Sequence, residues 1–470
     1  MTLFKIAFRN ILRNARRSLL TASAIAVGAI AMIAFGQYMG FVVKGFETGV
    51  IERDGHLSVF HKGYFDFGAG NPGAYSIAGY RSVIGLIKDD PVLRPLINVV
   101  TPTVTLYGIA GNFAIDASKT FLGVGVVPAD RERMLQWDEF GINAEALNGR
   151  PHYHFPLKEG DPTDAVLGIG LARMLGLCKP LRIANCPSPP PTATTAIANA
   201  PPPDVNLAEL AARDRPARTT ARREPRIDLL AATANGAPNV ISLKVSGARS
   251  QGFKELDDMY VGMDISAAQE LLYGRGEHKA VSIVLQLHHT ADVARTQARL
   301  LALFKAHGLD LEVHDFTELE PQYNQVIGLF GAIFVFIAVI MSVIVLFTVV
   351  NTMSMSVMER TGEIGTARAM GVRRSGIRRQ FLLEGWMLGA IGATSGVVLA
   401  AVIAALFNRL GLTWTPPGQA SPIPLLLLTR GMWGFEAAVW LALIAMATIA
   451  ALMPANRAAR MMIVDALRHV

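Results

Sequence analysis

Four long apolar stretches stand out against a mixed pattern of polar and apolar residues. The first covers residues 18–43 without a charged residue, and the others cover 326–350, 385–408 and 437–456. About 20 apolar residues in a helix cross a hydrocarbon core of roughly 30 Å, so each stretch is long enough to span a membrane. The first exceeds the apolar core of a signal peptide, about 7 to 15 residues, and is therefore expected to be an uncleaved anchor.

The segment between the first two spans, residues 44–320, is long enough for one or two folded domains. In its last third, segments with the two-residue period of a strand alternate with segments that have the 3.6-residue period of a helix. Strands are expected at 239–246, 280–287 and 310–314, and helices at 264–272 and 291–307. Asp264 suits the N-cap of the first helix. The second helix is expected to present four apolar residues inward: Val293, Leu300, Leu301 and Phe304. The sequence therefore predicts four transmembrane α-helices with a large α/β (α+β) extracytoplasmic domain between spans 1 and 2.

Residues 187–226 differ from the rest of this domain. Seven of the seventeen residues from 187 to 203 are proline, and an arginine-rich polar run follows. Such a composition cannot bury a core, so the segment is either a solvated insertion or a docking site for anionic lipid or an acidic partner. The composition favours the solvated insertion. Cys178 and Cys186 precede it, and either a local disulfide or two free thiols is compatible with the sequence.

Overall composition agrees with a membrane protein. Apolar residues make up 51% of the 470 residues and charged residues only 17%, against about 25% charged in ordinary soluble domains. The net charge is +7, but much of the positive charge lies beside the apolar stretches, where it sets orientation. We therefore expect no nucleic-acid partner.

Lysine and arginine in the short flanks predict the orientation. They are concentrated in residues 1–17, 351–384 and 457–470 and sparse in 409–436. By the positive-inside rule the three basic segments face the cytoplasm, so both termini lie there and residues 44–320 and 409–436 lie outside. Residues 1–17 also place apolar residues at helical spacing, which indicates either an amphipathic helix in the cytoplasmic interface or a simple basic flank.

The third span carries four glycines on one helix face: Gly385, Gly389, Gly392 and Gly396. Small residues at this spacing let a second helix approach closely, because packing drives association in lipid. No ionisable residue lies deep in any span, although an ion-coupled carrier is expected to keep one there. The energy for any transport is therefore expected to come from a source other than ion movement through the spans.

The chain shows no catalytic constellation and no pattern of metal ligands. It also contains no G-x-x-x-x-G-K-[ST] phosphate loop, whose backbone N–H groups would cradle the phosphates of ATP. We therefore expect no cofactor bound by this chain, no enzymatic activity of its own, and ATP and Mg²⁺ bound through a partner ATPase.

Residues 351–371 continue the second span into the cytoplasm and are predicted to form a short amphipathic helix that is rigidly joined to it. Met353, Val357 and Ile364 share one side, and charges lie beside them at Glu359, Arg360 and Glu363. This ordered pattern is typical of an amphipathic helix that can transmit force to the span, rather than of an ordinary basic loop. Gly371 is expected to end the helix as a C-cap.

This segment resembles a known family. Its sequence is Met358-Glu-Arg-Thr-Gly-Glu-Ile-Gly-Thr-Ala-Arg-Ala-Met-Gly371, followed by Arg373-Arg-x-x-Ile-Arg-Arg-Gln-Phe-Leu-Leu-Glu384. Both parts are similar to the signature of ABC transporter permeases of the macrolide-exporter, lipoprotein-releasing and FtsX type. The opening Lys5-x3-Arg9-Asn10-x2-Arg13, the closing Pro454-Ala-Asn-Arg-Ala-Ala-Arg460 and the large loop after the first span resemble it too.

The resemblance implies a bacterial inner-membrane permease that dimerises with a second copy or a paralogue and binds two cytoplasmic ATPase subunits. It assigns this ATPase coupling to Met358, Glu359, Arg360, Glu363, Ile364, Arg368 and Gly371. The implied function is mechanotransmission to the outer domain for lipoprotein release or export of hydrophobic cargo, with a periplasmic adaptor or lipoprotein as a further partner. The alternatives are an FtsX-like regulator of a cell-wall hydrolase and a sensor outside the ABC class.

Overall fold

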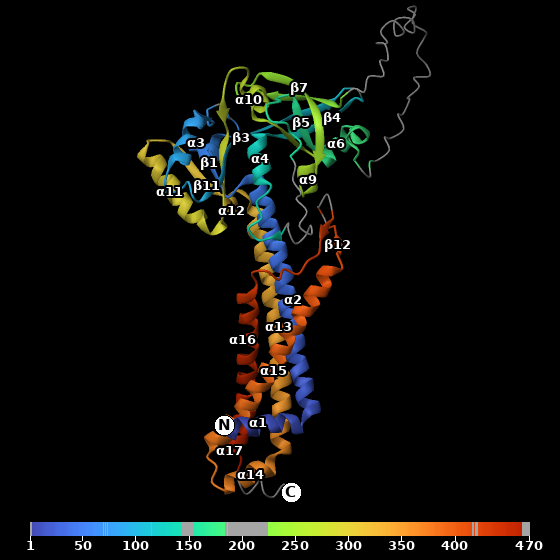
Figure 1. Ribbon diagram of the computed structural model, residues 1–470, viewed down its shortest axis with the longest axis vertical. Helices are drawn as coiled ribbons and strands as arrows, with labels where there is room; N and C mark the ends of the chain where they lie inside the picture. The colour runs from blue at the N-terminus through green and yellow to red at the C-terminus, as the bar shows by residue number, and fades with distance from the viewer. Residues whose placement is uncertain are drawn as a thin grey trace, which may run out of the picture.

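The computed structural model describes residues 2–68, 70, 72, 74–113, 115–142, 155–183, 186, 224–415, 418 and 422–462. A bundle of long helices carries a β-rich domain at one end (Figure 1). We call residues 57–319 the sheet domain, and the opposite end of the bundle, where α1, α14 and α17 lie, the basal end.

The predicted fold class is confirmed. Four helical segments are long and apolar enough to cross a membrane, and a mixed α/β domain separates the first from the second. They are α2 (Ala15–Asp54), α13 (Pro321–Glu359), α15 (Arg374–Arg409) and α16 (Trp433–Ala450), which continues into α17 (Leu452–Arg460). The membrane boundaries within these helices stay predictions.

Two of these helices are much longer than a membrane requires. α2 has 40 residues and α13 has 39, so each extends about 60 Å. They lie side by side from the basal end to the sheet domain (Figure 1). Their parts beyond the bilayer thickness therefore form a stalk beneath the sheet domain.

Two short helices lie at the basal end, α1 (Thr2–Arg13) and α14 (Thr361–Ala369). The helix predicted for residues 1–17 therefore ends earlier, at Arg13, because the backbone departs from helical geometry at Asn14 (φ −107°, ψ 40°). Phe4, Phe8 and Leu12 of α1 are exposed, as expected for a helix that presents an apolar face to a membrane interface.

The four glycines of α15 contact two different helices. An added Cβ at Gly385 or Gly389 would lie 2.4 or 2.8 Å from Ala451 or Ala447, at the end of α16. At Gly392 and Gly396 it would lie 2.7 and 2.5 Å from Ile25 and Ala29 of α2. Glycine is therefore required wherever α15 meets these backbones, and the stripe places α15 between α2 and α16.

The sheet domain has two lobes that share one long strand, β3 (Ile97–Asn112). In the first lobe, the beginning of β3 joins an antiparallel sheet with β10 (Ser282–Leu287), β1 (Leu57–His61) and β11 (Leu311–Asp315). Helices α3 (Tyr80–Asp89) and α11 (Val293–Ala306) pack on one face of this sheet. The other face turns toward the stalk.

The second lobe is a closed barrel. The strand order is β3, β4 (Ala117–Val126), β8 (Tyr260–Asp264), β5 (Asp164–Gly168), β7 (Pro238–Arg249) and β6 (Arg226–Ala232), and β6 pairs again with β3. Closure leaves no free edge in the ring. Helix α10 (Ile265–Tyr273) packs its apolar side against the barrel core.

The remaining elements are short. They are η1 (Tyr64–Gly68), β2 (Ile77–Ala78), α4 (Pro128–Met134), α6 (Ile169–Met174), α7 (Cys178–Leu181), α9 (Lys254–Asp257), β9 (Lys279–Ala280), η2 (Thr290–Asp292), α12 (Phe316–Leu319), β12 (Thr413–Trp414) and β13 (Ile423–Pro424).

Several local predictions for the sheet domain are confirmed. The Asp264 side chain caps α10 by accepting a hydrogen bond from the Ser266 N–H, and the expected strands correspond to β7, β10 and β11. Leu300 and Phe304 are buried as predicted, but Leu301 is 45% exposed. Leu300 and Phe304 lie four residues apart on one face of α11, whereas Leu301 is rotated about 100° from Leu300 and lies outside this apolar face.

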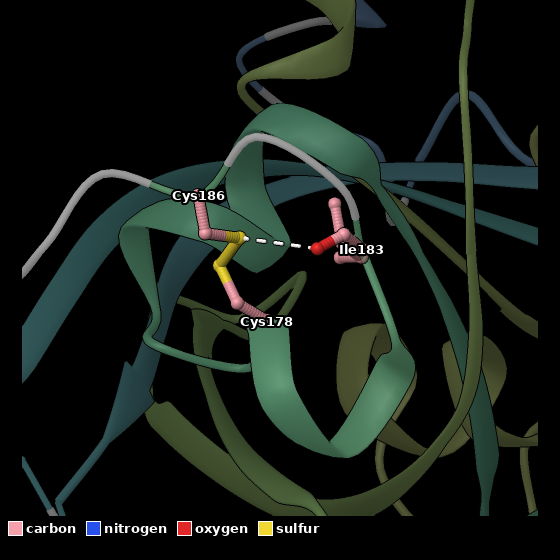
Figure 2. The surroundings of a disulfide bond; sticks show 3 residues. All are labelled: Cys178, Ile183 and Cys186. Carbon is pink, nitrogen blue, oxygen red and sulfur yellow. Dashed lines mark hydrogen bonds between the residues drawn. A yellow bond between two sulfur atoms is a disulfide. The ribbon is translucent and has the colours of Figure 1, made fainter.

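Cys178 and Cys186 form a disulfide (Figure 2). The Cys186 Sγ lies 3.7 Å from the carbonyl oxygen of Ile183, and the bridge joins Cys186 to the first residue of α7. Most of the proposed insertion 187–226, and residues 463–470 of the tail, lie outside the described residues. Arg226 begins β6, however, so the insertion cannot extend to it.

We predict that Gly396→Leu lowers the thermal stability of the chain in detergent, because the larger side chain forces α15 away from α2. Overpacking of this kind lowers the free energy of unfolding by about 1–3 kcal/mol. Gly331→Leu in α13 is the matched control, since a Cβ there meets nothing within 4 Å. Equal thermal midpoints for the two variants would contradict this packing.

Candidate functional site

A buried carboxylate organises the basal end of the bundle. Glu384 of α15 is 3% exposed, and its two oxygens accept hydrogen bonds from Nη1 of Arg360 at 2.9 and 3.1 Å. Nδ2 of Asn10 in α1 donates to the same carboxylate at 2.7 Å. Because both charges are buried and bonded, this cluster joins α1, α15 and the end of α13 in one arrangement.

Two partly exposed ion pairs surround this cluster. Arg13 of α1 pairs with Glu363 of α14 at 2.8 Å, and Arg17 of α2 pairs with Glu359 at the end of α13. Exposed pairs contribute at most about 1 kcal/mol each. We therefore attribute the orientation of α14 mainly to the buried Arg360–Glu384 pair, with the outer pairs connecting it to α1 and α2.

The chain turns sharply between α13 and α14. α13 ends at Glu359 and α14 begins at Thr361, with Arg360 at φ −107° and ψ 18° between them. The prediction that one rigid helix continues from the span is therefore wrong. Arg360 leaves helical geometry, and its side chain turns inward to Glu384.

Gly371 terminates α14. Its N–H bonds to the carbonyl of Arg368, and the Val372 N–H bonds to the carbonyl of Ala367. These two bonds make a Schellman motif, which requires a left-handed residue at Gly371, here with φ 93°. Arg368 donates from Nη1 to the carbonyls of Ala459 and Met461, so α14 is also attached to the end of α17.

Five of the seven residues assigned to ATPase coupling divide into two groups by exposure, while Arg368 and Gly371 fix the end of α14. Met358 is 68% exposed, and Glu359 and Glu363 are partly exposed. Arg360 and Ile364 are buried, so the structure places them inside the protein rather than at a docking surface. The sequence interpretation did not separate the two groups, because all seven lie within a single motif.

Three contributors to the basal end were not predicted. Asn10 and Glu384 belong to the buried cluster, and Met370 is 76% exposed beside α14. An acidic residue at the beginning of an apolar span, within a basic flank, was the available signal for Glu384. Asn10 and Met370 were inside quoted motifs, but nothing in their spacing indicated a role.

The upper end of the stalk is tied to the sheet domain. Arg53 of α2 pairs with Glu320, directly before α13, and with Asp54. Arg131 of α4 donates to the carbonyl oxygens of Glu52 and Arg53, which end α2. Burial raises the pKa of Glu320, although the neighbouring Arg53 opposes the shift. The two stalk helices are therefore fixed to each other and to the sheet domain.

His56 follows α2 and is fully buried. Its Nδ1 accepts the N–H of Leu287 at 3.0 Å, and its ring packs edge-on against Trp137 and Phe316. Burial lowers the pKa of His56 from 6.5 to about 3. His56 is therefore neutral at neutral pH and joins the end of α2 to β10.

A cavity of about 1000 Å³ lies beside the stalk, and we call it the stalk cavity. Its walls are mostly apolar and include Met39 and Val43 of α2, Phe334 of α13 and Phe435 of α16. A cavity of this size and character accepts an apolar chain or a drug-sized molecule. Within the described ranges, no cluster of three or more His, Cys, Asp or Glu residues could hold a metal ion.

Comparison with known proteins shows what the later membrane helices of the chain resemble. Residues 335–463 match the family described as FtsX-like permease C-terminal. The macrolide export ATP-binding/permease protein MacB of Escherichia coli is 29% identical over 36% of this chain and 26% of that protein. A protein of the same name from Hyphomonas neptunium is 29% identical over 49% and 34%. The pyoverdine export ATP-binding/permease protein PvdT of Pseudomonas savastanoi is 39% identical over 25% and 16%.

These findings confirm the resemblance to permeases of the macrolide-exporter and FtsX type and support a multi-pass bacterial membrane protein. The matches to these curated relatives span about a sixth to a third of the relatives' own length. The relatives are named as ATP-binding and permease proteins together.

We predict that Arg360→Met lowers the free energy of unfolding by about 3–5 kcal/mol, because it leaves the Glu384 carboxylate buried without its partner. The double variant Arg360→Met/Glu384→Leu should regain most of this loss. Denaturant unfolding in micelles measures both. Arg13→Met, which removes an exposed pair, is the control and should cost under about 1 kcal/mol. A double variant no more stable than the single one would contradict the pairing.

A second prediction concerns pH. The pKa of His56 is lower in the folded chain than in the unfolded one, so the unfolded chain binds more protons between about pH 3 and 6.5. Stability should therefore fall as the pH drops from 6.5 toward 3, by at most about 1.4 kcal/mol per pH unit. His56→Asn should flatten this dependence in thermal unfolding, whereas His289→Asn, at an exposed histidine, should not. An unchanged slope in His56→Asn would show that other groups cause it.

Proposed function

We propose that this chain is the permease subunit of an ABC transporter that converts ATP hydrolysis by a separate ATPase into motion of its sheet domain. One observation carries the proposal. Two unbroken helices, α2 and α13, join the basal cluster to the sheet domain over about 60 Å. A displacement at one end is therefore conveyed to the other without passing cargo between the spans.

The basal end is the proposed docking site for the ATPase. Met358, near the end of α13, and Met370, directly after α14, are exposed at this end, while α14 is held on its inner side by Arg360 and Arg368. A push on α14 would reach α15 through Glu384, and α2 through the pair between Glu359 and Arg17. In this proposal two ATPase subunits, which bind ATP and Mg²⁺, act on a dimer of permease chains.

The orientation follows from the basic flanks. The basal end would face the cytoplasm of a bacterial inner membrane, with both termini there, and the sheet domain would lie in the periplasm. The proposed cargo is hydrophobic, such as a lipoprotein or a small amphiphile, because the stalk cavity, whose walls are mostly apolar, lies beside α2 and α13. The names of the relatives, which give export of macrolides and of pyoverdine, support export as the function without fixing the cargo.

The FtsX-like alternative, a regulator of a cell-wall hydrolase without transport, uses the same bundle, since the matched family covers only residues 335–463. Transport in proteoliposomes separates the two proposals. ATP-dependent removal of a hydrophobic cargo from the bilayer supports the exporter. ATP-dependent activation of a hydrolase without any such removal supports the regulator.

We predict that Met358→Asp/Met370→Asp reduces co-purification of the ATPase at least about tenfold, because apolar contacts at an interface are replaced by hydrated charges. Thermal stability should stay unchanged, since both side chains are exposed. Met174→Asp, at a partly exposed methionine of the sheet domain, is the matched control. Undiminished ATPase binding and stimulation in the double variant would place the docking surface elsewhere.

A further inference from the structure

The sheet domain contains a second cavity, of about 550 Å³, where its two lobes meet the top of the stalk. The first lobe supplies one wall from β1, β10 and β3, and the barrel supplies β4 and β8. Arg53 of α2 and Glu320, which precedes α13, line it from below. We call it the hydroxyl cavity, after Ser58, Thr101, Thr103, Thr105 and Ser282, which line it.

Strand register explains why these hydroxyls gather. Ser282 lies directly opposite Thr103, and Val284 lies opposite both Ser58 and Thr101. Thr101, Thr103 and Thr105 alternate along β3 and therefore point to one face of the sheet. The opposite face of the first lobe is occupied by α3 and α11, so the hydroxyl face is the one left toward the stalk.

None of the five hydroxyls has a hydrogen-bond partner among the described residues, although other serines and threonines do, such as Ser76 and Thr163. Ser58, Thr101 and Ser282 are at most 6% exposed. Among the five, Thr101 alone has a fully buried, unbonded Oγ1 in the described structure, and buried polar groups are almost always bonded. The other four hydroxyls line the cavity and are available to a ligand there.

Most of the charged groups around the cavity have partners within the protein. Arg53 pairs with Asp54 and Glu320, and Arg131 binds the carbonyls at the end of α2. Glu255 is exposed to solvent. The Arg131 Nε is buried without a partner, but charges of both signs line the cavity, and the five hydroxyls are the larger set of unbonded groups. Each hydroxyl both donates and accepts, which favours a partner that is neutral overall and carries hydroxyl groups of its own.

The other walls of the cavity are apolar. Leu122 and Val124 of β4 line it, as do Phe60 and Phe253, and Phe60 stacks on Tyr64 with ring centroids 5.0 Å apart. The volume lies within the range of small-molecule sites, about 300–1000 Å³. We propose that the hydroxyl cavity is a binding site for a neutral, polyhydroxylated amphiphile, with a sugar-like head on the hydroxyls and an apolar part against β4.

The position of the site gives the ligand a role. A molecule in this cavity touches both lobes and the residues that join the stalk to them, so its binding favours one relative arrangement of lobes and stalk. Binding itself requires neither the ATPase nor transport. Failure of this proposal can therefore be distinguished from failure of the proposed permease function.

Photolabelling tests the site directly. The full chain in nanodiscs is exposed to a diazirine-bearing octyl glucoside below its micelle concentration, and the labelled peptides are mapped by mass spectrometry. We expect labels around residues 58–64, 101–105 and 253–260. Excess octyl glucoside should displace them, whereas its tetra-O-methyl analogue, which has the same chain but no hydroxyl donors, should not.

Variants locate the contacts. Thr103→Val/Ser282→Ala should weaken displacement by about three- to tenfold for each hydroxyl removed. It should not lower the thermal midpoint, because neither hydroxyl bonds to the described protein. Thr120→Val, at an exposed threonine of β4 outside the cavity, is the matched control. Labels elsewhere, equal displacement by the methylated analogue, or unaltered binding in the double variant would overturn the proposal.

Discussion

The buried pair between Arg360 and Glu384 is the interaction on which the basal end depends. It lies where α13 turns into α14, and Asn10 brings α1 to the same carboxylate. A buried charge without a partner is costly, so the cluster tolerates few alternative arrangements. The helices around it consequently behave as one unit, and a displacement of α14 reaches α15 and α1 together.

The glycine contacts of α15 extend this constraint through the bundle. Gly385 and Gly389 approach α16, and Gly392 and Gly396 approach α2. In lipid, where apolar surface gains little by being buried between helices, such close packing is the main source of association. α2 is thus held by α15 within the bundle and by Arg131 and His56 at its upper end. This is why a single helix can connect two distant sites.

The two cavities lie one above the other along the stalk helix α2. The stalk cavity lies beside the stalk and is mostly apolar, whereas the hydroxyl cavity lies above it and combines apolar and hydroxyl walls. Both contact α2, at Met39 and Val43 in one case and at Arg53 in the other. An occupant of either cavity therefore acts on the same helix that leads to the basal cluster.

The sequence by itself determined the four spans, the mixed α/β domain between the first two, and the N-cap at Asp264, because length, periodicity and capping act over a few residues. It also identified the motif around α14. Only the tertiary structure decided that Arg360 and Ile364 turn inward, that β6 returns to β3 and closes the barrel, and that five hydroxyls from three strands meet in one cavity. These features depend on which strands pair and which helices cross, and residues far apart in the chain make those contacts without leaving a local pattern.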